Sequence, residues 1–204
     1  MGYRDVYAGW QANPEGFWME AAKQIDWVTP PSKALNDSRA PLYEWFTDAT
    51  VNTCYNAVDR HVLAGRGDQV AIIHDSPVTR TKHSITYREL QTRVASLAGA
   101  LRAKGVAKGD RVIIYMPMVP EALEAMLACA RLGAIHSVVF GGFAANELAV
   151  RIDDCTPKAI IAASCGIEPS RVVHYKPLLD AAIDMATHKP DFCVILQREQ
   201  EVAS

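Results

Sequence analysis

Short apolar runs alternate with amphipathic stretches along the C-terminal two thirds of the chain. The runs at 111–116, 135–140, 158–163 and 192–196 have the length and apolar character of buried strands. Apolar residues recur at helical spacing between these runs. The predicted helix faces are Leu123, Met126, Leu127 and Ala130, then Ala145, Leu148, Ala149 and Ile152, and finally Leu179, Ala182, Ile183 and Ala186. This alternation predicts an α/β fold with a doubly wound, mostly parallel sheet flanked by helices.

A hairpin and a capped helix are predicted just before this alternating region. The β-rich runs 69–75 and 83–87 flank a polar, proline-containing connection, which indicates an irregular hairpin. Thr86 and Glu89 have the spacing of a capping box, in which each side chain accepts from the other residue's backbone amide. The helix that they open is expected to end near Gly105 and to bury one face, formed by Leu90, Val94, Leu97 and Leu101.

The first 50 residues differ from the rest in composition. They contain all four tryptophans, interleaved with prolines, and show little continuous periodicity. Asn13 and Pro14 suit the cap and first position of a short helix that extends to about Ile25. We expect an irregular helical segment anchored by its aromatic side chains, with a partly disordered arm as the alternative. A separate helix is predicted over 53–64.

Composition excludes several classes of protein. The chain has 204 residues, 50% of them hydrophobic and 22% charged, which is ordinary globular usage. The net charge of −2 provides no overall basic field for nucleic acid or an anionic membrane. No apolar run approaches the roughly 20 residues of a membrane helix, and the start lacks a signal peptide. The expected location is the cytoplasm, or the mitochondrial matrix if a leader has been removed.

The five cysteines lack the spacing of a metal site. They occur without a Cys-x-x-Cys pair and in odd number, so neither a zinc site nor a disulfide framework is indicated, and no metal-binding residue is predicted. Cys129 and His136 are candidates for a thiol–imidazole pair, but both fall within predicted core elements, which favours packing over catalysis.

Candidate binding loops follow the predicted strands, at 116–120, 140–144 and 164–171. Ligands of doubly wound sheets bind beyond the carboxyl ends of the strands. Gly141 and Gly142 follow one strand and offer bare backbone amides to a phosphate or a ring, although a tight turn explains both glycines without any ligand. Arg171 is suited to pair with a phosphate, or else is a solvated charge. The residues alone therefore indicate an α/β domain with a loop that favours anions.

Several motifs occur in order along nearly the whole chain: Trp45-Phe46, Val51-Asn52, Val58-Asp59-Arg60-His61, the segments 85–90 and 114–122, the segment 128–143, and Arg151-Ile152-x-Asp154. Together these motifs resemble short-chain acyl-CoA synthetases of the AMP-forming acetyl- and propionyl-CoA synthetase family. Residues 1–50 resemble the segment that precedes the adenylating domain, and residues 51–204 resemble the first part of that domain.

The resemblance implies a two-step ligation. A carboxylate reacts with ATP to form an acyl-adenylate and pyrophosphate, and the thiol of coenzyme A then displaces AMP, with Mg²⁺ required in the first step. The family's Ser/Thr/Gly-rich phosphate loop, its ribose-binding aspartate and its catalytic lysine have no counterpart in residues 1–204. The chain is therefore expected to be truncated before the ATP loop, to carry no catalytic residue and to be inactive alone.

One family site falls inside the chain. The loop that binds coenzyme A in the family aligns with Glu168, Pro169, Ser170 and Arg171, and Gly142 is expected near the adenine end of the cofactor. Glu168 occupies the position where acetyl-type members have an arginine. Ser170 occupies a position where a glycine is usual. The Glu-Pro-x-Arg pattern resembles the propionyl-CoA synthetase branch. The family's usual serine at position 144 is Ala144, which removes an N-cap.

The leading hypothesis is therefore a ligase of propionate metabolism, with small-molecule substrates. The alternatives are acetyl-CoA synthetase, a related adenylating ligase for another acyl group, and a noncatalytic module that binds coenzyme A or a nucleotide. We expect no nucleic acid or membrane partner. Apolar surface left uncovered in a truncated chain would favour self-association.

Overall fold

The chain divides into two compact units in the structure, a computed structural model that describes residues 2–204. The first unit ends at Asn56 and the second spans Ala57–Ser204. A division was expected after residue 50, which lies inside strand β4 (Thr50–Val51). Each unit is described by itself.

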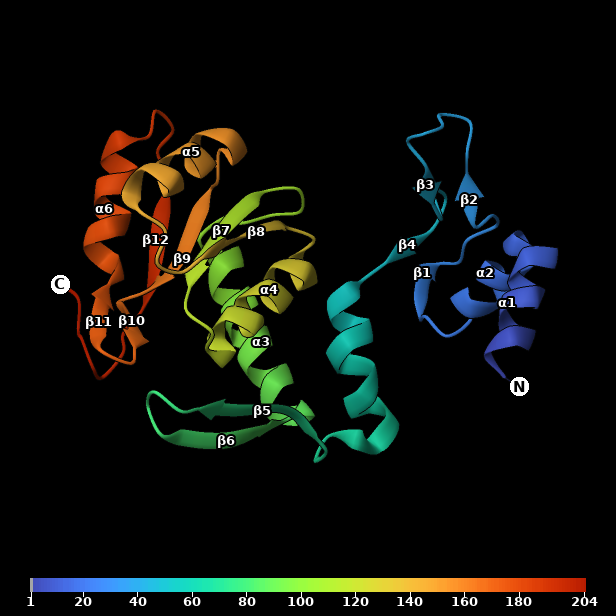
Figure 1. The fold of residues 1–204 in the computed structure, drawn as a ribbon, viewed down its shortest axis with the longest axis horizontal. Helices are drawn as coiled ribbons and strands as arrows, with labels where there is room; N and C mark the ends of the chain where they lie inside the picture. Colours follow the sequence, from blue (N-terminus) through green and yellow to red (C-terminus); the bar gives the residue numbers. More distant parts are fainter. Residues whose placement is uncertain (1) are drawn as a thin grey trace. The chain divides into compact units, whose positions relative to one another are not determined.

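Two helices and four short strands make up the N-terminal unit (Figure 1). They are α1 (Tyr3–Ala12), α2 (Pro14–Ala22), β1 (Trp27–Thr29), β2 (Leu35–Asn36), β3 (Glu44–Trp45) and β4. The predicted start of α2 is confirmed, because the Asn13 side chain accepts from the Gly16 amide at 2.9 Å and Pro14 occupies the first turn. Helix α1 was not predicted, and it buries none of its residues.

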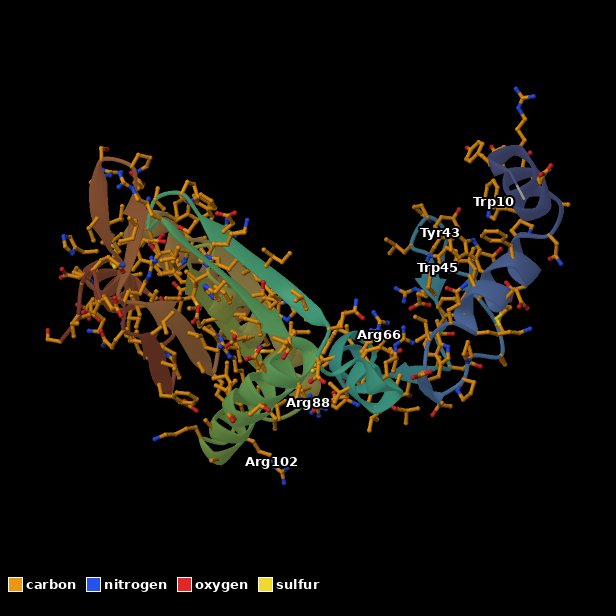
Figure 2. All side chains as sticks on the ribbon, turned by 90° about the horizontal axis from the view of Figure 1, so that it is seen from below. Trp10, Tyr43, Trp45, Arg66, Arg88 and Arg102 are labelled. Atoms are coloured by element: carbon orange, nitrogen blue, oxygen red, sulfur yellow. The ribbon has the colours of Figure 1, made fainter. Side chains whose placement is uncertain are left out.

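Aromatic side chains hold the N-terminal unit together, as expected from their abundance. The Trp18 and Trp45 rings meet edge to face with centroids 5.3 Å apart, and Trp27 and Phe46 meet at 5.4 Å. The Trp27 indole donates to the Ala22 carbonyl at 2.8 Å. Figure 2 shows Trp45 and Tyr43 projecting from the β2–β3 region of this unit. The segment is thus folded around its aromatic residues and is not a disordered arm.

The C-terminal unit contains the main sheet and two separate hairpins. Helix η1 (Tyr55–Asp59) begins two residues before the unit boundary and continues into this unit. The elements that follow are η2 (Val62–Arg66), β5 (Val70–Ser76), β6 (Thr81–Thr86), α3 (Tyr87–Ala103), β7 (Arg111–Met116), α4 (Pro120–Leu132), β8 (Ile135–Phe140), α5 (Ala145–Cys155), β9 (Ala159–Ala163), β10 (Cys165–Glu168), β11 (Arg171–His174), α6 (Tyr175–Met185) and β12 (Phe192–Leu196). The structure is helical over the predicted range 53–64, which includes the π-helical stretch η1 and the start of a second one, η2, that ends at Arg66.

The predicted doubly wound sheet is confirmed. Its strand order is β12-β9-β7-β8, with every pair parallel. The chain leaves β7 for β8 on one side and then returns to place β9 on the other, so the order reverses between β7 and β9. Helices α3 and α4 pack together, and so do α5 and α6 (Figure 1). Right-handed crossovers in the two directions place α4 and α5 on opposite faces of the sheet.

The predicted hairpin and capping box are also confirmed. Strands β5 and β6 pair antiparallel with one irregularity near Val70. Thr86 accepts from the Glu89 amide at 3.3 Å, and Glu89 accepts from the Thr86 amide at 2.8 Å. Helix α3 buries Leu90, Val94 and Leu101 of its predicted face, together with Ala98, whereas Leu97 is half-buried. Local sequence signals were sufficient here because both partners of each contact lie close in the chain.

The predicted face of α4 is only partly buried. Leu123 is exposed, and the other three predicted residues are half-buried. The buried positions are instead mainly small residues, Ala122, Ala125, Ala128 and Cys129, together with Pro120 and Glu124. Apolar residues occupy most positions of this helix, so its sequence contains two apolar stripes. The stripe of small residues is the one that packs, because short side chains let α4 approach α3 and the sheet closely.

The expectation that His136 lies in the core is also wrong. Strand β8 ends the sheet as the structure describes it, and His136 is exposed there, as are Ile135, Val138 and Phe140. Cys129 is fully buried as expected, and burial raises the pKa of its thiol to about 11. These two residues therefore have opposite environments, which argues against a thiol–imidazole pair.

Candidate functional site

A cavity of about 490 Å³ lies at the carboxyl end of the parallel sheet. Its walls include Met116 at the end of β7, Phe140 at the end of β8, and Gly166 just beyond β9. The sheet order reverses between β7 and β9, so the cavity occupies the position where doubly wound sheets bind ligands. Residues from each of the three predicted binding loops line it.

The third of these loops is a β-hairpin, which corrects the sequence prediction. Strands β10 and β11 pair antiparallel, and Glu168 lies opposite Arg171 at the end of the ladder. Pro169 and Ser170 form the exposed turn between them. Two β-rich runs on either side of a proline-containing turn indicate a hairpin. Here each strand has only four residues, so the sequence signal for the hairpin is weak.

An ion pair closes this hairpin. The Arg171 Nε donates to Glu168 Oε2 at 2.8 Å. The hydrogen bond and charge of Arg171 lower the pKa of Glu168, and Glu168 in turn raises the pKa of Arg171. Both side chains are exposed to solvent, so we assign the pair little stabilising energy. The pair matters instead because the Arg171 guanidinium already has an anionic partner in Glu168.

The structure brings only some of the predicted site residues to the cavity. Gly142 and Glu168 line it, whereas Pro169, Ser170 and Arg171 lie at the hairpin tip and do not contribute to its walls. Gly142 has a φ of +111°, which favours glycine because a Cβ would be strained there.

Tyr175, which the sequence analysis did not single out, explains the neighbouring Gly141. A Cβ at Gly141 would lie 2.4 Å from the Tyr175 hydroxyl, and one at Gly166 would lie 2.5 Å from it. Tyr175 therefore packs between the loop after β8 and the start of the β10 hairpin. This close approach supports the structural explanation for Gly141 that the sequence had left open.

A second tyrosine, Tyr115, is hydrogen-bonded to the loop after β8. The Tyr115 hydroxyl donates to the Phe143 carbonyl at 2.9 Å, and the rings of Tyr115 and Tyr175 lie 5.0 Å apart. Burial raises the pKa of both hydroxyls, that of Tyr175 to about 12 with a further contribution from Tyr115. Both tyrosines are therefore neutral at pH 7, and they support the loop at Gly142 by packing and hydrogen bonding.

Two further parts of the chain complete the walls. The β5–β6 hairpin contributes His74 and Asp75, and Arg198 follows β12. Sequence reasoning missed Arg198, although the signal was present: the rule that directs attention to the carboxyl ends of strands applies to β12 as well as to the other three. The position of His74 and Asp75 had no sequence signal, because it depends on how the hairpin folds back on the sheet.

This cavity is suited to binding. Its walls are mainly apolar, with a few charged side chains. Within residues 2–204, no group of three or more His, Cys, Asp or Glu side chains is arranged to hold a metal ion. In the same described part of the chain, no helix is long and apolar enough to span a bilayer.

Two protein families match the two structural units. The acetyl-coenzyme A synthetase N-terminus family matches residues 3–57, and the AMP-binding enzyme family matches residues 59–203. The chain belongs to the AMP-binding enzymes. The resemblance to short-chain acyl-CoA synthetases that the sequence analysis stated is thereby confirmed.

Similar proteins are found in animals and bacteria. The chain is 53% identical over 196 residues to "Acyl-CoA synthetase short-chain family member 3, mitochondrial" of Bos taurus, a match that covers 96% of this chain and 29% of the relative. It is 49% identical over 199 residues to "Acetyl-coenzyme A synthetase" of Xanthobacter autotrophicus, covering 96% of this chain and 30% of that protein. The chain thus spans less than a third of the length of these relatives.

Proposed function

We propose that this chain is the N-terminal part of an AMP-forming short-chain acyl-CoA synthetase that acts on propionate. The observation that carries the proposal is the match of both units, in order, to the AMP-binding enzymes and to the segment that precedes them in acetyl-CoA synthetases. The names of the bovine and Xanthobacter relatives support the same class of reaction.

The proposed reaction has two steps. A carboxylate oxygen of the acid attacks the α-phosphorus of ATP, the bond to the β-phosphate oxygen breaks, and pyrophosphate leaves. The thiol sulfur of coenzyme A then attacks the acyl carbon, the bond to AMP breaks, and the thiol loses its proton. Mg²⁺ would neutralise phosphate charge in the first step. We assign the groups that bind ATP and Mg²⁺ to other parts of the enzyme and expect this chain to be inactive alone.

Within the chain, we propose that the cavity and the hairpin beside it form the coenzyme A site. Gly142 and Glu168 line the cavity, and Pro169, Ser170 and Arg171 form the hairpin tip. The volume of about 490 Å³ suits part of a nucleotide-sized ligand, and the apolar walls would exclude water from it. The Gly142 position lets a planar group approach the backbone without meeting a side chain.

Propionate is proposed as the acid because of the hairpin sequence. Glu168, Pro169 and Arg171 follow the Glu-Pro-x-Arg pattern that resembles the propionyl-CoA synthetase branch. Acetate is the alternative, supported by the acetyl-CoA synthetase relatives. We also propose a cytoplasmic location, with the mitochondrial matrix as the alternative that the name of the bovine relative supports.

Acid-dependent release of pyrophosphate from ATP tests this proposal. The assay compares propionate with acetate, each with and without coenzyme A, for this 204-residue chain and for the complete reading frame that encodes it. We expect activity in the longer protein only, with a higher kcat/KM for propionate.

The other outcomes have distinct meanings. A higher kcat/KM for acetate would overturn the choice of acid and keep the ligase. Activity of the 204-residue chain would contradict our assignment of the ATP site. Absence of activity in every form, combined with measurable coenzyme A binding, would favour a noncatalytic binding module.

A further inference from the structure

The charges on the cavity walls do not balance one another locally. The Asp, Glu and Arg residues that line the cavity are Asp75, Glu168 and Arg198. Each carboxylate has its own cation outside the walls: Lys82 Nζ lies 2.9 Å from Asp75, and Arg171 Nε lies 2.8 Å from Glu168. Across residues 2–204, Arg198 has no carboxylate within ion-pair distance. The wall therefore presents one uncompensated positive charge.

Arg198 is held firmly in place by Ser164 and Cys165. Its backbone amide donates to the Ser164 hydroxyl at 2.9 Å, and its Nη1 donates to the Cys165 carbonyl at 3.2 Å. Ser164 is fully buried, and its own amide donates to the Leu196 carbonyl at 2.8 Å. The segment after β12 is therefore tied to the end of β9, beside the position where the sheet order reverses.

The guanidinium retains donors for a ligand. It carries five N–H groups in a planar fork, and the carbonyl of Cys165 takes one of them in the described structure. The Arg198 side chain is half-buried, and the cavity walls that it shares include the apolar residues Val173 and Ile167. A phosphate in such a setting forms charge-assisted hydrogen bonds that are stronger than in open water.

We infer that Arg198 binds a phosphate group of the ligand inside this cavity. The ligand class is a phosphorylated nucleotide; under the proposed function, on which this identification rests, it is coenzyme A. The geometry favours Arg198 over Arg171 for this contact, since the Arg171 guanidinium is exposed, is paired with Glu168 and does not line the cavity. Phosphate binding thus depends on the wall after β12 as well as on the hairpin tip.

Calorimetric titration of the 204-residue chain with coenzyme A and with 3′,5′-ADP tests the inference. The variants are Arg198→Gln and Arg198→Lys, with Arg102→Gln as the matched control, because Arg102 is an exposed arginine of α3 that points away from the unit (Figure 2). A charged hydrogen bond contributes about 1.5–3 kcal/mol, so we expect Arg198→Gln to raise both dissociation constants about 10- to 100-fold. Arg198→Lys should recover part of this loss, and Arg102→Gln should change little.

A phosphate-free ligand separates binding from folding. Adenosine should bind wild type and Arg198→Gln equally, because it lacks the phosphate that Arg198 is proposed to contact. A merely structural role for Arg198 would instead weaken the binding of adenosine as well as that of the phosphorylated ligands. Equal binding of coenzyme A and 3′,5′-ADP by wild type and Arg198→Gln would overturn the inference, as would failure of the wild-type chain to bind either. If the dissociation constants depend on Arg198 but acid-dependent pyrophosphate release is absent from the longer protein, the proposed function fails and the phosphate site stands.

Discussion

Asp59 accepts two hydrogen bonds from Arg131, whose Nη2 lies 2.8 Å from both carboxylate oxygens. The Gln91 amide donates to the same carboxylate at 2.8 Å. Asp59 is only 9% exposed, and its partners come from helices α3 and α4. One carboxylate thus ties the start of the C-terminal unit to both helices on one side of its sheet.

Removing this carboxylate should destabilise the C-terminal unit. Asp59→Ala removes the carboxylate that Arg131 and Gln91 both contact, and breaking a largely buried pair costs about 3–5 kcal/mol. We expect a fall of about 3 kcal/mol in the free energy of unfolding, measured by urea denaturation with circular dichroism. Lys82→Ala breaks the exposed pair with Asp75 and should cost at most about 1 kcal/mol. Equal losses in the two variants would contradict a special role for Asp59.

Restoring a cap should stabilise helix α5. Ala144 occupies the N-cap position with extended backbone angles and makes no side-chain cap bond, while Glu147 lies three residues later. Ala144→Ser would therefore complete a capping box, and we expect a gain of about 0.5–1 kcal/mol in the free energy of unfolding. Ala144→Gly is the control and should gain less. A serine variant no more stable than the glycine variant would show that no cap forms.

Two glycines of the C-terminal unit should respond to alanine in opposite directions. Gly141→Ala would place a Cβ 2.4 Å from the Tyr175 hydroxyl and 2.8 Å from the Met116 carbonyl, so we expect a lower thermal midpoint and weaker coenzyme A binding. Gly99→Ala lies in α3 with no atom within 4 Å, and the better helix propensity should raise stability by about 0.5–1 kcal/mol. Unchanged stability of Gly141→Ala would show that Tyr175 moves aside at little cost.

The buried thiols should resist alkylation in the folded chain. Burial raises the pKa of Cys129 to about 11, so at pH 8 its reactive thiolate is scarce as well as inaccessible. Cys193 is exposed and should react first with iodoacetamide, as read by peptide mass spectrometry. Cys193→Ser should remove most of the early labelling, and full labelling of Cys129 should require denaturant. Early modification of Cys129 would indicate that α4 opens readily.

Arg171 should affect the second half-reaction rather than the first. In the complete enzyme we expect Arg171→Ala to raise the KM for coenzyme A severalfold and to leave adenylate formation, measured by pyrophosphate exchange, nearly unchanged. Arg171 lowers the pKa of Glu168 in the wild-type chain. In Arg171→Ala the pKa of Glu168 should therefore rise toward its ordinary value, as measured by NMR titration. A shifted Glu168 pKa with an unchanged KM would confine Arg171 to a structural role.

Much of the fold was determined by the sequence alone. The alternation of apolar runs and helical faces predicted the parallel sheet, and the Thr86–Glu89 spacing and Pro14 predicted two helix starts that the structure confirms. These signals are local: a cap, a strand period or a helix face involves residues within a few positions of one another. The motifs also sufficed to recognise the family.

The tertiary structure decided what depends on residues far apart in the chain. Only packing against α3 and the sheet shows which apolar stripe of α4 is buried, and only the fold places Tyr175 against both Gly141 and Gly166. The pairing of Glu168 with Arg171, which leaves Arg198 as the uncompensated cation of the cavity, likewise depends on a hairpin that local propensity signals weakly. Sequence periodicity records which positions are apolar, whereas contacts between distant segments determine which of them meet and which charges remain available to a ligand.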